Sequence, residues 1–205
     1  MVYRSVSAAS CSRTSEGDAI ASVFVVSGPS GAGKGTVIAL VKQRVSHVVT
    51  SVSATTRAPR PGELDGREYH YLTRPEFERR AAAGEFLEWV EYSDDLYGTL
   101  RAEVDAKLAR GDDVILEIEL IGARKVRSVL PEAIAVFIAP PSMAELSHRL
   151  RGRGTETDAA IARRLHIAQT EVAAAEEFDH VVINDDAPRA ANELAAIIED
   201  RRKGN

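Results

Sequence analysis

The fold of this chain is decided by residues 22–44, which read SVFVVSGPSGAGKGTVIALVKQR. The short, β-branched run at 22–26 is typical of a buried strand, and the apolar spacing over 34–44 predicts a helix. Between them lies a glycine-rich turn. Glycines let backbone N–H groups turn toward phosphate oxygens, and a helix N-terminus with a lysine adds positive charge. The segment therefore predicts a phosphate-binding loop.

The loop departs at one position from the usual pattern G-x-x-x-x-G-K-[ST]. Gly35 stands where a hydroxyl residue is expected, and Thr36 follows one place later. We therefore expect Thr36 to approach Mg²⁺, directly or through a water molecule. The alternative, a glycine-rich turn without a ligand, is disfavoured by the strand before it and the helix after it. The residues expected to bind phosphate groups in this loop are Gly28, Pro29, Ser30, Gly31, Ala32, Gly33, Lys34, Gly35 and Thr36.

The rest of the chain alternates between apolar runs and helical patterns. Further strands are expected at 114–116, 133–139 and 180–183, and further helices at 100–109, 142–150, 158–175 and 188–202. This alternation favours an α/β fold whose parallel sheet is covered by helices on both faces. Residues 53–97 break the rhythm with prolines, glycines and an alternating run at 86–92 that predicts an antiparallel strand. We interpret them as an inserted lobe, and the polar RGRGTET at 151–157 as a second insertion.

Composition excludes several classes of protein. The 205 residues fit one domain, and 44% hydrophobic with 28% charged residues exclude a wholly disordered chain. The net charge of −5 argues against a general nucleic-acid binder, and the single Cys11 excludes an internal disulfide. No apolar run approaches the roughly 20 residues that span a bilayer. We expect a cytoplasmic protein without nucleic-acid or membrane partners. Residues 1–20 are interpreted as a flexible leader, with an organelle-targeting leader as the alternative.

Several ordered segments resemble the guanylate kinases, which transfer a phosphoryl group from ATP to GMP. The resemblance covers about residues 22–194 and is carried by SGPSGAGKGT (27–36), SVSATTRAPRPGELDGREYHY (51–71), GEFLEWVEY (84–92), YGT (97–99), LEIELIGA (116–123), FIAPPS (137–142), RGRGTET (151–157) and VIND (182–185). It implies a P-loop nucleoside monophosphate kinase fold whose core comprises 21–52, 98–145 and 170–205. It also implies a GMP-binding lobe at about 53–97, a lid at about 146–169, and Mg²⁺ as cofactor with ATP.

Two arginines are candidates for binding the acceptor phosphate. Arg57 and Arg60 lie three residues apart in a proline-flanked turn, and planar guanidinium groups bind phosphate bidentately. Alone, such a pair would more simply be a solvated surface pair. The resemblance implies that both bind the GMP phosphate, helped by the hydroxyl groups of Tyr69 and Tyr97. For the tyrosines, core packing remains an alternative.

The resemblance assigns guanine recognition to Glu88, Ser53 and Thr99. Guanine presents two adjacent donors, N1–H and the 2-amino group, and one carboxylate accepts both. Adenine lacks that pair, so a buried Glu88 facing AMP would keep an unpaired charge. Without the resemblance, Glu88 would be an outward residue on an alternating strand.

Two further carboxylates end a predicted strand in Leu116-Glu117-Ile118-Glu119, where ligands of open α/β sheets gather. Glu119 is assigned to GMP. The family usually carries Asp at the position of Glu119 and Gln at that of Ile121, so the role of Glu119 is open and Ile121 has no polar function. A solvent-facing strand end is the alternative.

The resemblance also assigns arginines of the lid. It implies that Arg153 and Arg164 contact the ATP phosphates and that Asn184 lies near the adenine; we interpret Arg149 and Arg163 as structural. The expected catalytic set is Lys34, Arg57, Arg153 and Arg164. These assignments predict direct in-line phosphorylation of GMP and dGMP, because no residue resembles a nucleophile. Two alternatives stay open: a P-loop kinase for another phosphorylated acceptor, such as a ribose bisphosphate, and a catalytically silent guanylate-kinase-like module. Such modules typically lose the phosphate loop, which is intact in this sequence.

Overall fold

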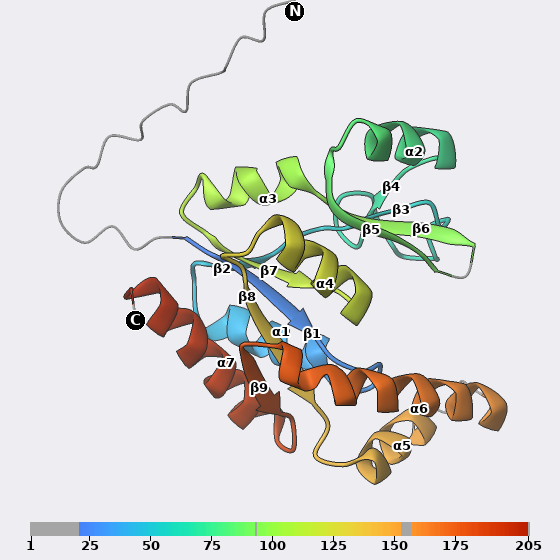
Figure 1. Cartoon of the computed structure of the whole chain (residues 1–205), viewed down its shortest axis with the longest axis vertical. Helices are drawn as coiled ribbons and strands as arrows, with labels where there is room; N and C mark the ends of the chain where they lie inside the picture. Colours follow the sequence, from blue (N-terminus) through green and yellow to red (C-terminus); the bar gives the residue numbers. More distant parts are fainter. Residues whose placement is uncertain (1–20, 93, 153–156, 205) are drawn as a thin grey trace, which may run out of the picture.

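The computed structural model describes residues 21–92, 94–152 and 157–204 (Figure 1). Its centre is a five-stranded parallel sheet in the order β2-β7-β1-β8-β9. The strands are β1 (Val23–Ser27), β2 (Val48–Thr50), β7 (Asp113–Glu117), β8 (Ile134–Ala139) and β9 (His180–Ile183). The expected strands at 114–116, 133–139 and 180–183 are confirmed.

Helices cover both faces of this sheet. Side chains alternate along β1, so Phe24 and Val26 pack with α1 (Lys34–Arg44) and α7 (Ala187–Arg202). Val23 and Val25 point the other way and pack with α3 (Arg101–Leu108) and α4 (Leu120–Val129). All five residues of β1 are buried, as expected for a central strand between two helical layers. The predicted fold class is confirmed.

A second, smaller sheet lies to one side of the first (Figure 1). It has the order β4-β3-β6-β5 and is built from β3 (Ala54–Thr55), β4 (His70–Tyr71), β5 (Phe86–Tyr92) and β6 (Asp95–Leu100). Strand β5 pairs antiparallel with β6, which confirms the expectation for 86–92. Helix α2 (Arg74–Ala82) covers the sheet, with Phe77 stacked on Phe86 at 4.3 Å between ring centroids.

Two helices form a separate pair below the main sheet in Figure 1. They are α5 (Met143–Gly152) and α6 (Asp158–Ala173), followed by a 3₁₀ turn at Ala174–Glu177. Leu146, Leu150 and Ile161 give the pair its own small core. The predicted leader at 1–20 and Arg153 lie outside the described residues. Within the described part of the chain, no helix is long and apolar enough to cross a membrane.

Two elements of the main sheet and its helical layers were not predicted from the sequence. Strand β2 has only three residues and pairs on one side with β7, so its apolar signal is short. Helix α4 follows β7 after two residues and buries Leu120, Ala123 and Val126 at helical spacing. This apolar spacing is visible in the sequence. It follows directly on Glu117 and Glu119, which were interpreted only as carboxylates at the end of a strand.

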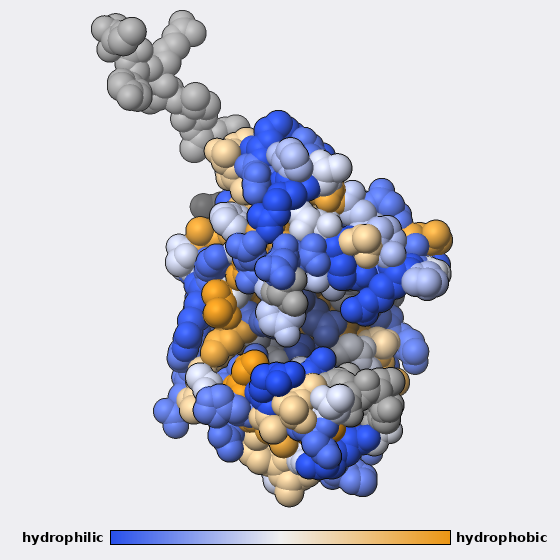
Figure 2. Space-filling view, turned by 90° about the vertical axis from the view of Figure 1, so that its right-hand side faces the viewer, coloured by the Kyte–Doolittle hydropathy of each residue, from blue (hydrophilic) through white to orange (hydrophobic). Residues whose placement is uncertain are grey.

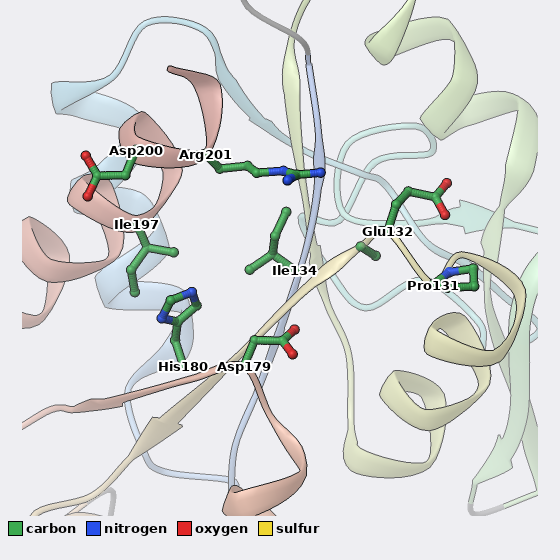
Figure 3. Close-up of a pocket in the computed structure, with 9 residues that line it drawn as sticks. Pro131, Glu132, Ile134, Asp179, His180, Ile197, Asp200 and Arg201 are labelled. Atoms are coloured by element: carbon green, nitrogen blue, oxygen red, sulfur yellow. The ribbon is translucent and has the colours of Figure 1, made fainter. Parts of the chain in front are cut away.

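Because the five strands are parallel, their carboxyl ends meet at one edge of the sheet. The phosphate loop follows β1 at this edge, Glu117 ends β7, and Asn184 follows β9. At the opposite edge, residues before β8, at the start of β9 and in the last turns of α7 line a pocket of roughly 580 Å³ (Figure 3). None of the predicted site residues lines that pocket.

Candidate active site

The phosphate loop requires glycine at two positions because neighbouring groups come close to its backbone. Gly28 has φ +144°, and a Cβ there would collide with the carbonyl oxygen of Ile138. Gly33 has φ +90°, and a Cβ there would collide with the Asn184 amide. Both φ values are unfavourable for other residues. The loop therefore needs glycine at these two positions to keep its shape.

Lys34 is the first residue of α1, and its side chain folds back over the loop. The Nζ atom donates to the carbonyl oxygen of Gly28 at 2.6 Å and lies 3.4 Å from that of Pro29. These contacts place a full positive charge beside the helix N-terminus, where it adds to the field of the helix.

Asn184 and Arg149 form hydrogen bonds to the backbone of the phosphate loop. Asn184 is 4% exposed, and its Nδ2 donates to the carbonyl oxygen of Ala32 at 2.7 Å. Arg149 donates from Nη2 to the carbonyl oxygen of Asn184 at 2.9 Å and from Nη1 to that of Ala32 at 3.4 Å. The residue predicted to lie near adenine is thus fixed beside the phosphate loop, and Arg149 ties α5 to both.

Of the two lid arginines predicted to act on ATP, the structure describes Arg164. Its Nη1 donates to Ser30 Oγ in the phosphate loop at 2.9 Å. Helix α6 is therefore in direct contact with the loop.

In the smaller sheet, Arg57 lies among the predicted tyrosines. Its guanidinium carbon is 5.4 Å from the centroid of the Tyr69 ring, and the rings of Tyr69 and Tyr97 are 6.0 Å apart. Arg60 has an exposed side chain. The structure thus brings together Arg57, Tyr69 and Tyr97, while Arg60 contributes its backbone.

Glu63 connects these groups and was not predicted as a site residue from the sequence. Its carboxylate accepts from Arg57 Nη2 at 3.0 Å to each oxygen, from the Arg60 backbone N–H at 2.7 Å and from the Tyr71 hydroxyl at 2.8 Å. The Arg60 N–H, then Tyr71 and Arg57, lower the pKa of Glu63 to about 2. An acidic residue six positions after Arg57, within the same proline-flanked turn, was the available signal.

The predicted guanine reader, Glu88, is buried rather than outward. It is 6% exposed, and Oε1 accepts from the hydroxyl of the fully buried Thr99 at 2.8 Å. Burial raises the pKa of Glu88, while the Thr99 hydrogen bond lowers it. The register of β5 against β6 shifts between Phe86 and Glu88, which breaks the simple alternation. Ser53 is half-buried just before β3 in the same sheet.

Carboxylates also gather beside the phosphate loop. A Cβ at Gly35 would lie 3.9 Å from both carboxylate oxygens of Glu117, and Glu119 is the N-cap of α4. Burial and the charge of Glu119 raise the pKa of Glu171 on α6 to about 7, while Lys34 lowers it. The described residues hold no group of three or more His, Cys, Asp or Glu side chains that would bind a metal by themselves.

A hollow separates the lobe of the smaller sheet from the part of the molecule that contains α5 and α6. Figure 2 shows this hollow between the upper lobe, which contains the smaller sheet, and the lower part, which contains α5 and α6. The visible residues around it are mostly hydrophilic. A hydrophilic hollow of this kind suits a polar ligand.

Comparison with known proteins agrees with this geometry. Residues 21–201 match the profile of the family described as guanylate kinase. The chain belongs to the guanylate kinase family.

The guanylate kinase of Rubrobacter xylanophilus is 54% identical over 176 residues, covering 86% of this chain and 92% of that protein. That of Synechococcus elongatus is 52% identical over 179 residues, covering 87% and 98%. Guanylate kinases are ATP:GMP phosphotransferases, and this chain catalyses the ATP-dependent phosphorylation of GMP.

A solved structure is similar over nearly the whole fold. The crystal structure of guanylate kinase from Anaplasma phagocytophilum matches with a TM-score of 0.72 at 29% identity, covering 90% of this chain and 88% of that chain. Against the guanylate kinase pattern, Ile121 is 61% exposed on α4.

Proposed function

We propose that the hollow binds ATP and GMP with their phosphate groups toward each other. ATP lies on the loop of residues 28–36, with its triphosphate on the backbone N–H groups and Lys34. GMP lies in the smaller sheet, with its phosphate at Arg57, Arg60, Tyr69 and Tyr97 and its base at Ser53, Glu88 and Thr99. The observation that carries this proposal is the buried Glu88, which is 6% exposed and bonded to Thr99.

The reaction in this arrangement is a direct in-line transfer. An oxygen of the GMP phosphate forms a bond to the γ-phosphorus of ATP, and the bond from that phosphorus to the β,γ-bridging oxygen breaks. The attacking oxygen is already anionic, so the step needs no general base. Catalysis then consists mainly of positioning and charge stabilisation, which we assign to Lys34, Arg57, Arg153 and Arg164. The lobe at about 53–97 and the lid at about 146–169 close on the substrates and exclude water.

Mg²⁺ fits the residues at the phosphate loop. This ion prefers oxygen ligands, keeps several waters and is commonly held by one or two carboxylates together with substrate phosphates. Glu117 and Thr36 offer such oxygens beside Gly35, where an added Cβ would lie 3.9 Å from both Glu117 carboxylate oxygens. When bound, Mg²⁺ would neutralise charge on the ATP phosphates.

Glu119 would orient the guanosine, and Asn184 would lie near the adenine. We also propose dGMP as a substrate and the cytoplasm as the site of action.

Steady-state kinetics of E88Q test the proposed base reading. Replacing the carboxylate with an amide leaves one acceptor where guanine needs two, so the kcat/KM ratio of GMP to AMP should fall about 100-fold. E91Q, an exposed change on the same strand, is the matched control and should keep the ratio. An unchanged ratio in E88Q would show that guanine is read elsewhere.

A further inference from the structure

Gly122 lies in the first turn of α4, against β5, and is buried. Its φ lies outside the left-handed region, so its backbone does not require glycine. Glycine is also among the poorest helix formers. The remaining reason for glycine at this position is that a neighbouring group occupies the space of a side chain.

The space beside Gly122 is taken up by Glu88. A Cβ at position 122 would lie 3.1 Å from Glu88 Oε2, which is tighter than most such contacts, and 3.4 Å from Cδ. The carboxylate oxygen would therefore have to move by a few tenths of an ångström. The other oxygen, Oε1, is fixed by the Thr99 hydroxyl at 2.8 Å. The Thr99 hydroxyl therefore fixes Oε1 of Glu88, and Oε2 occupies the space that a side chain at position 122 would enter.

We propose that Gly122 is a positioning residue for guanine specificity. Its missing side chain leaves the room in which both oxygens of Glu88 align with N1–H and the 2-amino group of guanine. This inference rests on the proposed role of Glu88. Gly122 touches neither substrate in this account; it acts through the carboxylate.

The test compares G122A with S128A, a change to alanine at an exposed position of the same helix. The KM values are measured for GMP, ATP and inosine monophosphate, which lacks the 2-amino group. G122A should raise the KM for GMP about tenfold or more, because a charge-assisted hydrogen bond is misaligned. The KM for ATP should stay within about twofold, and the preference for GMP over inosine monophosphate should fall. S128A should change none of these values. A KM for GMP within about twofold of the parent in G122A would overturn the proposal.

A double-mutant cycle with E88A separates this proposal from the proposed function and covers a G122A variant that folds poorly. Truncating Glu88 frees the space, so G122A should add no loss of GMP binding or thermal stability in the E88A background. A further loss of about tenfold in kcat/KM for GMP there would overturn the proposal, because Gly122 would then act independently of Glu88. If E88A alone left the KM for GMP unchanged, the assignment of Glu88 itself would fail.

Discussion

At the scale of single residues, the charge of Lys34 is the clearest requirement. Its Nζ lies over the loop, 2.6 Å from the carbonyl oxygen of Gly28. Removal of this charge should lower kcat about 100- to 1,000-fold, since preorganised charge at the transferring group is lost. K34A and K42A are compared in a coupled assay of ADP release. Lys42 is an exposed residue of the same helix, and its loss should leave kcat unchanged. Equal activity of K34A and the parent would contradict the assignment of Lys34.

The ionisation of Glu171 should make the stability of the folded protein depend on pH. Its pKa is raised from 4.5 to about 7, first by burial and then by Glu119. A raised pKa means that the fold favours the protonated form, so this stabilisation is complete below about pH 4.5 and lost as the pH rises through 7. E171Q stays neutral and should therefore raise the free energy of unfolding at pH 8 by about 1 kcal/mol, allowing for solvent screening.

Thermal unfolding of E171Q at two pH values checks this. At pH 8 the midpoint should rise by roughly 2–4 °C, and at pH 4.5 it should match the parent. E176Q, at an exposed position of the following 3₁₀ turn, is the control. The same shift at both pH values would show that charge on Glu171 is not the cause.

At the scale of elements, the turn between β3 and β4 is held together by Glu63. Because this carboxylate anchors Arg57 and the Arg60 backbone, E63Q should misplace the groups that bind the GMP phosphate. The KM for GMP should rise about tenfold, with the KM for ATP unchanged. The pKa of Glu63 is lowered to about 2, so its charge and these contacts are present above pH 4.5 and are lost as the pH falls toward 2. E78Q, exposed on α2, is the control, and equal effects of E63Q on both substrates would contradict a local role.

The helices and strands also show how much of the structure can be predicted from the sequence. Helix α1 and strand β9 begin and end where their patterns indicated, because their apolar spacing is decided locally. Glu88 was expected from the resemblance, but its burial depends on a register shift against β6 that alternation along one strand does not reveal. Glu63 was missed because its partners come from backbone and side chains brought together only by the turn.

At the scale of the whole molecule, Asp113 joins parts of the chain that are far apart in sequence. It is 1% exposed, and it accepts from the Ser22 N–H at 2.7 Å and from Arg202 Nη1 at 2.9 Å. It thereby connects the start of β1 and the end of α7 to β7. D113A would leave Arg202 without this partner and should lower the free energy of unfolding by about 3–5 kcal/mol.

Urea unfolding of D113A and D112A measures this contribution. Asp112 pairs with the exposed Arg110, so D112A should cost less than about 1 kcal/mol. A similar loss in both variants would show that the buried contacts of Asp113 do not hold the sheet and α7 together.

The central claim is that two nucleotides meet across the hollow with their phosphates facing. A crystal structure with GMP and a non-hydrolysable ATP analogue tests it most directly. We predict that the guanine edge lies within hydrogen-bond distance of both Glu88 oxygens, that the GMP phosphate contacts Arg57, and that the triphosphate lies on residues 28–36. A guanine bound away from Glu88, or a triphosphate bound away from the loop, would contradict the account.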